Sequence, residues 1–226
     1  MNEATLQKMK NMKFYGMMRA FSTTLESGQT SRYTPDEMVA FLVESEWDER
    51  HNRKIDRGLK NAKFRYKANI EDLIFDQKRN LDKNEVHRLA DCTFIGKKQN
   101  IIITGSTGVG KSYLASALGY QACINGYKII YSNTSKLISK LKMAKADGAH
   151  LRELSKIEKQ DALILDDFGV QPFDAGSRAL LLDIIEDRHG KRTTIITAQK
   201  KKKKWHEVIG EKTLADAIMD RIVHQS

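Results

Sequence analysis

The amino-acid sequence predicts an α/β domain with a mostly parallel sheet flanked by helices, preceded by a small all-helical N-terminal domain. Four short apolar runs rich in β-branched residues alternate with helical segments in the second part of the chain, which is typical of a parallel sheet. The first part has apolar residues at helical spacing and no such run. We therefore predict a helical domain over residues 1–67 and an α/β domain over residues 68–226.

The N-terminal part carries a helix-start signal at Thr34 and Pro35. Threonine is a preferred N-cap, and proline suits the first helical position because its missing N–H would be unpaired there in any case. Apolar residues recur at near-helical spacing after this point, at Met38, Phe41 and Leu42. A helix beginning at Pro35 is therefore expected.

The second part divides into alternating strands and helices. Strands are expected at residues 100–104, 128–131, 162–165 and 193–197. Helices are expected at residues 111–125, 134–146, 177–188 and 213–224.

The composition fits a folded protein with anionic partners. The chain has 226 residues, 40% of them apolar, and a formal net charge of +10. This charge favours nucleic acid first and acidic membrane surfaces second, although a solubilising surface would give the same number. Cys92 and Cys123 lack metal-ligand spacing and are expected to be reduced. Without a signal peptide or an apolar span, the expected compartment is the cytoplasm, with no membrane partner.

A phosphate-binding loop follows the first expected strand. The sequence matches G-x-x-x-x-G-K-[ST] at Gly105, Ser106, Thr107, Gly108, Val109, Gly110, Lys111 and Ser112. The glycines allow successive backbone N–H groups to converge on an anion, and the following helix N-terminus adds positive charge. Lys111 can reach the β- and γ-phosphates, and the Ser112 hydroxyl can bind Mg²⁺. The alternative is a glycine-rich turn without a ligand.

Two acids stand at the end of the third expected strand. Asp166 and Asp167 follow an apolar run, and ligands of parallel sheets bind at the carboxyl ends of strands. Asp166 is placed to hold Mg²⁺ directly or through water, and Asp167 to polarise the attacking water. Thr197 and Gln199 end the fourth strand and are candidates for contacting the γ-phosphate. Local hydrogen bonds in a turn are the alternative for this pair.

Several segments together resemble one known family. They are the phosphate loop and residues 44–50, 69–73, 94–95, 165–169, 185–188, 193–197 and 205–210. This set, which includes segments outside the ATPase core, is similar to IstB, the ATPase helper encoded by a class of bacterial insertion sequences. The resemblance implies an AAA+ P-loop fold related to bacterial helicase loaders and the replication initiator. It also implies a further segment beyond Ser226 that carries a second sensor arginine.

The resemblance assigns roles to individual residues. It implies that ATP or ADP binds at residues 107–113, which adds Tyr113 to the site, and that Asp166 and Asp167 are the Walker B pair. Thr197 or Gln199 would be the first sensor. Arg221 matches the arginine finger, which stabilises transition-state charge in a neighbouring subunit. An ordinary surface salt bridge is the alternative for Arg221.

The resemblance also implies partners. Members assemble on duplex DNA as homo-oligomers with ATP at subunit interfaces, deform that DNA, and recruit and stimulate their transposase. The chain departs from the family at residues 200–204, where five lysines replace an apolar, proline-containing turn.

Basic residues support a DNA interface independently of the family. The candidate contacts are Arg50, Arg53, Lys54, Arg57, Lys60, Lys63, Lys136 and Lys140. Phosphate contacts give position and salt dependence rather than sequence selectivity. These residues form two strips, one within residues 50–63 and one at Lys136 and Lys140. A solvated helix face is the alternative for both strips.

Two other functions share the phosphate loop. A replicative helicase loader would have the same ATPase core and bind a helicase. A small-molecule kinase would need an acceptor pocket and a lid with arginines, whereas the paired acids and Arg221 favour water as the acceptor.

Overall fold

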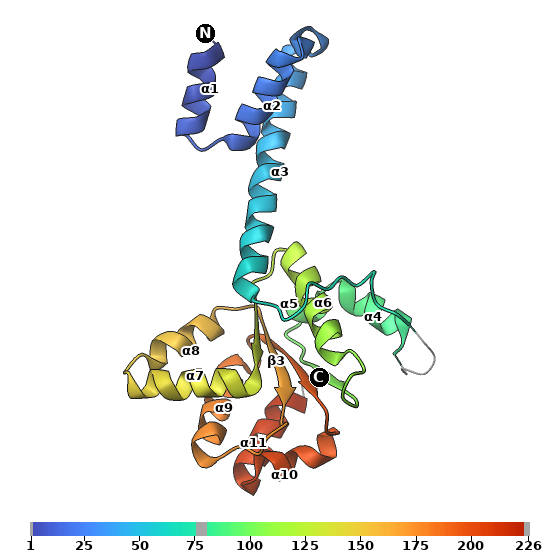
Figure 1. Cartoon of the computed structure of the whole chain (residues 1–226), viewed down its shortest axis with the longest axis vertical. Helices are drawn as coiled ribbons and strands as arrows, with labels where there is room; N and C mark the ends of the chain where they lie inside the picture. The colour runs from blue at the N-terminus through green and yellow to red at the C-terminus, as the bar shows by residue number, and fades with distance from the viewer. Residues whose placement is uncertain (1, 76–80, 224–226) are drawn as a thin grey trace. The chain divides into compact units, whose positions relative to one another are not determined.

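The computed structural model describes residues 2–75 and 81–223. The chain divides into two compact units, Met1–Arg57 and Gly58–Ser226. The first is helical and the second contains the sheet (Figure 1). The division falls inside a long helix, α3, because the last turn of α3 packs in the second unit through Leu59 and Ala62. Among the described residues, no helix has the length and apolarity needed to cross a membrane.

The N-terminal unit is built from consecutive helices. They are α1 (Asn2–Asn11), α2 (Tyr15–Glu26), η1 (Gln29–Arg32) and α3 (Pro35–Ala62). At the start of α3, Glu37 N donates to Thr34 Oγ1 over 3.3 Å, and Thr34 N donates to Glu37 Oε2 over 2.8 Å. This reciprocal capping pair confirms the predicted helix start at Pro35.

A buried carboxylate joins α2 to α3. Glu46 is only 5% exposed, and its Oε2 accepts hydrogen bonds from Gly16 N and Met17 N at the first turn of α2. An anion at a helix N-terminus satisfies otherwise unpaired amides and offsets their partial charge. A Cβ at Gly16 would lie 2.2 Å from the carbonyl oxygen of Ser45. Glycine is therefore required at this crossing.

The second unit contains a four-stranded parallel sheet. Its strands are β1 (Ile101–Thr104), β2 (Ile129–Asn133), β3 (Ala162–Phe168) and β4 (Thr193–Ala198), in the order β1-β4-β3-β2. Leu163 and Leu165 face one apolar cluster, while Ile164 between them faces the other. Because side chains alternate along a strand, a run of consecutive apolar residues shows that both faces of the sheet are covered.

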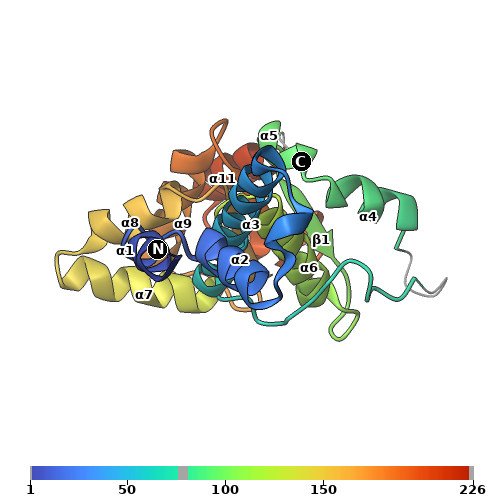
Figure 2. The same cartoon turned by 90° about the horizontal axis from the view of Figure 1, so that it is seen from above.

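Helices cover both faces of the sheet. They are α4 (Lys83–Ala90), α5 (Thr93–Gly96), α6 (Lys111–Ile124), α7 (Thr134–Ala146), α8 (His150–Glu158), α9 (Ala175–Arg188), η3 (Lys202–Lys204), α10 (Trp205–Ile209) and α11 (Lys212–Val223). Helices α7, α9, α10 and α11 share one core cluster, and α6 shares the other clusters with α4, α5 and the end of α3. Figure 2 shows α4 and α6 on the opposite side of this unit from α7 and α8.

The predicted α/β class is confirmed, with corrections at element ends. The predicted strand at residues 162–165 continues to Phe168, because a bulge between Leu165 and Phe168 keeps the acids within the strand. Helices α4, α5, α8 and α10 were not predicted, and each spans nine residues or fewer. The predicted last helix agrees with α11 as far as Val223, and His224 lies outside the described residues.

Candidate nucleotide site

The phosphate loop connects β1 to α6, which begins at Lys111. Gly108 and Gly110 have φ angles of 83° and 90°, in the left-handed region that side chains avoid. An added Cβ at either position would meet open space, so the backbone conformation alone requires glycine there. Left-handed glycines of this kind allow a loop to curve so that its backbone amides can face an anion.

Lys111 folds back over the loop. Its side chain is mostly buried, with 9% of the residue exposed, and Nζ donates a hydrogen bond to the carbonyl oxygen of Ser106 over 2.7 Å. This local bond holds the ammonium group at the mouth of the loop. A phosphate oxygen offers the same ammonium a charged acceptor, which forms a stronger hydrogen bond than a neutral carbonyl.

Asp166 is the buried centre of the site. It is fully buried, and its carboxylate accepts hydrogen bonds from the hydroxyls of Ser112 (2.7 Å), Tyr131 and Thr197. Burial raises the pKa of Asp166, but these three hydroxyls and the Arg65 guanidinium outweigh it, so the pKa lies below its usual range. Burial and the adjacent carboxylate raise the pKa of Tyr131. Asp166 is therefore ionised at neutral pH and Tyr131 keeps its proton.

Asp167 has a different environment. Its side chain is 31% exposed, and Oδ2 accepts a hydrogen bond from Asn133 Nδ2 over 3.1 Å. Its φ angle of 56° is left-handed, and such a conformation in a non-glycine residue costs about 1–3 kcal/mol. The bulge and Gly169, which is also left-handed, turn the chain at this point. Asp167 therefore faces outward, while Asp166 faces α6.

Thr197 connects the two acids. Its hydroxyl donates to Asp166 and accepts from the backbone N–H of Asp167 over 3.0 Å. The sheet order explains this position, because β4 lies between β1, which precedes the phosphate loop, and β3, which carries the two acids. Gln199, the other sensor candidate, lies exposed beyond the end of β4. The geometry thus favours Thr197 for sensing at the acids.

A donor set suitable for a hard cation lies between α6 and β3. Ser112 Oγ and Asp166 Oδ1 are 2.7 Å apart, joined by a hydrogen bond. Mg²⁺ in phosphate sites is usually bound by one or two carboxylates together with substrate phosphates and waters. In the described residues no group of three or more His, Cys, Asp or Glu side chains forms a metal cluster. A hydroxyl and one buried carboxylate beside a phosphate loop fit Mg²⁺.

A cavity adjoins the loop. It has a volume of about 450 Å³ and is lined by Asp72, Leu73, Ile74, Leu81, Ile103, Thr104, Val109, Gly110, Lys111, Tyr113 and Leu114. Volumes of this order suit small-molecule ligands, and the lining combines apolar walls with a polar end at Lys111. Such a cavity can hold a base and sugar while the loop holds phosphates. The predicted ligand residue Tyr113 lies on its wall.

Arg65, Tyr131 and Asn133 were not predicted as site residues. Arg65 Nη1 lies 3.4 Å from Asp166 Oδ2 and 3.3 Å from Asp167 Oδ2. In the sequence Arg65 belongs to a basic stretch that indicates DNA contact, and Tyr131 stands in an apolar strand. Asn133 gave a weak signal, since an asparagine just before a helix is a typical N-cap, and its side chain does cap α7.

Arg221 is engaged within its own chain. It donates to Glu186 Oε1 over 2.7 Å and to the carbonyl oxygen of Ala217 over 2.9 Å, and its side chain is 26% exposed. Its own carbonyl oxygen accepts a hydrogen bond from Asn100. Asn100 precedes β1 and so lies at the amino-terminal end of this strand, whereas the phosphate loop follows its carboxyl end. Arg221 is therefore not brought to the site of its own subunit.

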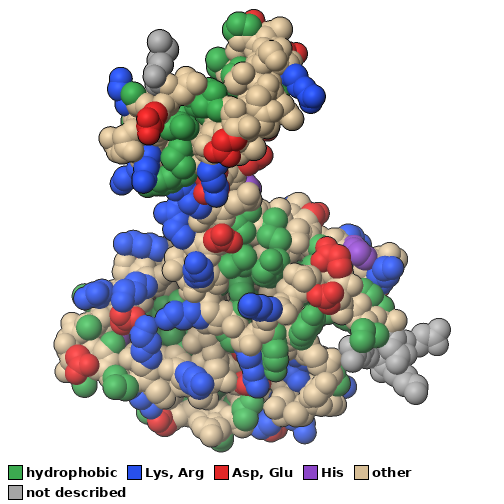
Figure 3. Space-filling model, turned by 45° about the horizontal axis from the view of Figure 1, so that its top comes forward, with side chains coloured by type: hydrophobic (Ala, Val, Ile, Leu, Met, Phe, Trp, Pro, Cys, Tyr) green, Lys and Arg blue, Asp and Glu red, His purple; other side chains and the backbone are tan. Residues whose placement is uncertain are grey.

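The predicted DNA contacts differ in their engagement. Arg50 donates to Glu46 over 2.7 Å, and Arg53 pairs with Glu49 at 3.5 Å. Lys140 pairs with Glu153 at 2.6 Å. The remaining candidates are exposed: Lys54, Arg57, Lys60, Lys63 and Lys136. Figure 3 shows basic side chains on the part of the second unit where α7 and α8 lie.

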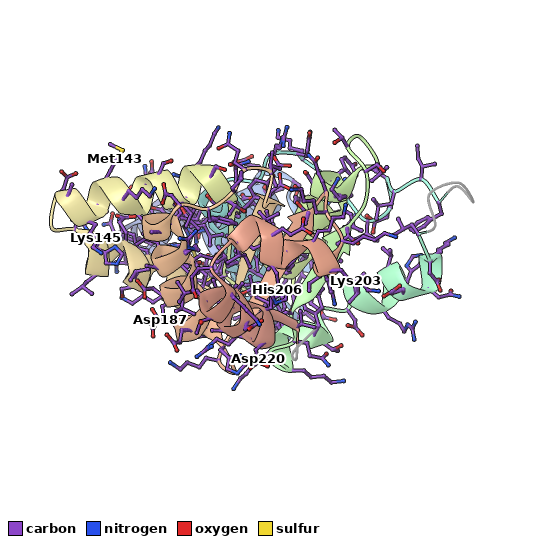
Figure 4. All side chains as sticks on the ribbon, turned by 90° about the horizontal axis from the view of Figure 1, so that it is seen from below. Met143, Lys145, Asp187, Lys203, His206 and Asp220 are labelled. Atoms are coloured by element: carbon purple, nitrogen blue, oxygen red, sulfur yellow. The ribbon has the colours of Figure 1, made fainter. Side chains whose placement is uncertain are left out.

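The five-lysine segment at residues 200–204 is exposed. Its first carbonyl, that of Lys200, accepts a hydrogen bond from Nε1 of Trp205 over 2.8 Å. Trp205 is 1% exposed and packs on Phe168, with ring centroids 4.6 Å apart. Figure 4 places Lys203 near His206 at the start of α10. A buried indole thus anchors this basic segment directly after β4.

Two relatives resemble this chain in sequence over most of their length. An insertion sequence ATP-binding protein of Sinorhizobium fredii, y4pL, is 39% identical over 98% of this chain and 91% of its own length. A Pseudomonas fluorescens protein named as the ATP-binding protein of insertion sequence IS1162 is 36% identical over 88% of this chain and 87% of its own.

Solved structures agree at the level of the fold. The DnaC helicase loader matches with a TM-score of 0.59 and 22% identity over 71% of this chain and 96% of that one. AMPPCP-bound DnaA from Aquifex aeolicus matches with a TM-score of 0.60 and 21% identity over 70% of this chain and 49% of that one. The predicted fold, a mostly parallel sheet between helices with a phosphate loop after the first strand, is confirmed.

The family itself follows from a match over almost the whole chain. The family model described as "IstB-like ATP binding protein" matches residues 7–226. This range includes most of the helical unit as well as the phosphate loop and both acids. The chain therefore belongs to the IstB-like ATP-binding proteins and is an ATPase.

Proposed function

We propose that this ATPase assists the transposition of an insertion sequence. It assembles on duplex DNA as a homo-oligomer with ATP at its subunit interfaces, and it recruits and stimulates the transposase at the target. The observation that supports this most is the length of the match, because relatives named as insertion sequence ATP-binding proteins align with 98% of the chain. The cytoplasm, where ATP and DNA are found together, is the compartment we infer.

The site residues would divide the hydrolysis between them. The amides of residues 105–112 bind the phosphates, and Lys111 exchanges its bond with Ser106 for a phosphate oxygen. Ser112 and Asp166 would hold Mg²⁺, which neutralises charge on the β- and γ-phosphates. Asp167, exposed and oriented by Asn133, positions the attacking water. Thr197 keeps the two acids in register with the loop.

Arg221 would complete the site of a neighbouring subunit. Arg221 lies at the amino-terminal end of the strands, and its own phosphate loop lies at the carboxyl end. It would therefore act on ATP in trans, after its ion pair with Glu186 breaks. Two inactive variants test this. Lys111→Ala removes the phosphate contact, and Arg221→Ala removes the finger. Mixing them should restore part of the ATPase rate, because some interfaces then combine an intact loop with an intact arginine. No recovery in mixed oligomers would exclude a shared site.

Duplex DNA would contact the exposed basic residues. Lys54, Lys60 and Lys63 have free surface, whereas Arg50 and Arg53 are already paired with acids of α3. Changing Lys60 to Gln should lower the slope of log K against log salt by about 1 without altering sequence preference. Lys98→Gln, at an exposed lysine outside both strips, is the control. An affinity that does not change between low and moderate salt would remove the DNA assignment.

A helicase loader is the second candidate, favoured by the structural likeness to DnaC. Phosphate release measured with duplex and with single-stranded DNA, together with a pull-down of the element's transposase, separates the two. Stimulation by duplex DNA and capture of the transposase support the transposition role. A response limited to single strands or to a replicative helicase would support the loader.

A further inference from the structure

Arg65 makes a contact that the hydrolytic scheme does not use. It stands in the segment after α3, 101 residues away in sequence from Asp166, and its Nη1 bonds to both acids. Among the described residues, Arg65 is the one cation within 4.0 Å of either carboxylate. Its side chain is 50% exposed, so it approaches the acids from the solvent side.

Aromatic rings hold this arginine in place. Its guanidinium lies over the ring of Tyr66, 5.4 Å from the centroid. The ring of Tyr66 lies 6.1 Å from that of Tyr113, which follows the metal-ligand candidate Ser112 in α6. Arginine stacks well on aromatic faces because its charge is delocalised and weakly hydrated. The contact with the acids is therefore supported from behind by a side chain next to the nucleotide cavity.

The hydrogen bonds around the two carboxylates show what Arg65 adds. Oδ1 of Asp166 faces Ser112 and Thr197, whereas Oδ2 faces Tyr131 and Arg65. Oδ2 of Asp167 faces Asn133 and Arg65. Arg65 thus joins the oxygens of the two acids that point away from the P-loop helix. Two adjacent carboxylates repel each other, and a shared cation relieves that repulsion.

We propose that Arg65 is a positioning residue that bridges Asp166 and Asp167 and competes with the divalent metal for their negative charge. The inference rests on the proposed metal ligands Ser112 and Asp166. A metal ion at those ligands neutralises the charge that Arg65 now shares, so tighter metal binding and a looser Arg65 contact go together. Arg65 also orients Asp167, so its removal should slow hydrolysis while strengthening metal binding. General damage to the site would weaken both.

The test measures how tightly Mn²⁺ binds to the ADP-saturated protein. The EPR signal of free Mn²⁺ reports the unbound fraction, and ADP without protein is the blank. Arg65→Gln should bind Mn²⁺ about two- to fivefold more tightly, the factor that an ion pair with a half-exposed partner is worth. Arg65→Lys keeps the charge but loses the planar guanidinium that stacks on Tyr66, so its Mn²⁺ affinity should lie between those of Arg65→Gln and the original protein. Lys67→Gln removes the same charge from an exposed neighbour and serves as the control.

Hydrolysis gives the second measurement. In Arg65→Gln both kcat and the Mg²⁺ concentration for half-maximal rate should fall, and Lys67→Gln should change neither. Equal Mn²⁺ affinity in Arg65→Gln and Lys67→Gln would overturn the inference. Asp166→Asn separates this failure from that of the metal assignment, because unchanged Mn²⁺ binding in Asp166→Asn would show that Asp166 is not a ligand at all.

Discussion

Asp166 and Arg188 are both charged and buried, yet the protein satisfies them in opposite ways. Asp166, at the carboxyl end of β3, receives side-chain hydroxyls from three different elements. Arg188, at the end of α9, donates chiefly to backbone carbonyl oxygens, those of Ile157, Gln160 and Thr193. Burial and the nearby Arg192 lower the pKa of Arg188 to about 9, so it remains charged at neutral pH.

The difference distinguishes the candidate site from a purely structural contact. A hydroxyl rotates and can exchange one partner for another, so the surroundings of Asp166 can adapt when a ligand arrives. A backbone carbonyl is fixed by its own element, so Arg188 locks the ends of α8 and α9 to the start of β4. Substitutions should therefore affect chemistry at the first region and stability at the second.

The largest effect is expected at the exposed acid. Asp167→Asn should reduce ATP hydrolysis by about 10²–10⁴-fold, because an amide cannot accept the proton of the attacking water. Nucleotide affinity should stay near that of the original protein, as measured with a fluorescent ATP analogue. Asp183→Asn, at an exposed position on α9, is the matched control. Hydrolysis within tenfold of normal would show that Asp167 is not the water-positioning group.

Arg188→Met should act on stability instead. Removing the guanidinium leaves several buried carbonyls without a donor, at about 1–3 kcal/mol for each group left unpaired. We expect the free energy of unfolding to fall by about 3 kcal/mol in urea titrations. Arg192→Met makes the same change at an arginine paired with Asp161 near the surface, and should cost less than about 1 kcal/mol. Similar losses of unfolding free energy in both variants would contradict the structural role of the buried Arg188.

Lys111→Ala should weaken ATP binding by about 10- to 100-fold, the worth of a hydrogen bond between charged groups. The free energy of unfolding should change little, because Lys111 bonds only to Ser106 within the loop. Isothermal titration with ATP checks the first expectation. Lys145→Ala, at an exposed lysine of α7, controls for the lost charge. Normal ATP affinity in Lys111→Ala would exclude this loop as the phosphate site.

The smallest effect is expected for Tyr131→Phe. Although burial raises the pKa of Asp166, hydrogen bonds including that of Tyr131 bring it below normal, so ionised Asp166 stabilises the fold above its unfolded pKa of about 3.9. That contribution is lost as the pH falls through the lower folded value. Tyr131→Phe should therefore cost about 1 kcal/mol at neutral pH and nothing at the acid end. Urea titrations across pH test this, with Tyr120→Phe as control; a loss independent of pH would contradict it.

The sequence predicted the parts of the candidate site that lie close together along the chain. The phosphate loop and the two acids each occupy a few residues whose context, a strand and a turn, is local. The contact of Arg65 with Asp166 was not predicted, because charge patterns do not reveal a partner 101 residues away and the basic neighbours of Arg65 indicated DNA binding. Tyr131 escaped because its hydroxyl matters only once β2 lies beside β3. The bulge at the acids likewise depends on pairing between strands, which no local pattern specifies.

The position of β4 between β1 and β3 has a mechanical consequence. β1, which leads into the phosphate loop, and β3, which bears the acids, each pair with β4 and not with each other among the described strands, so the strand between them sets their spacing. β4 therefore works as a spacer whose width is set by its backbone hydrogen bonds to β1 and β3. The side chains of Ile195 and Ile196 project from the two opposite faces of the sheet, so substitutions there should change the packing of the helices and leave the distance between the loop and the acids unchanged.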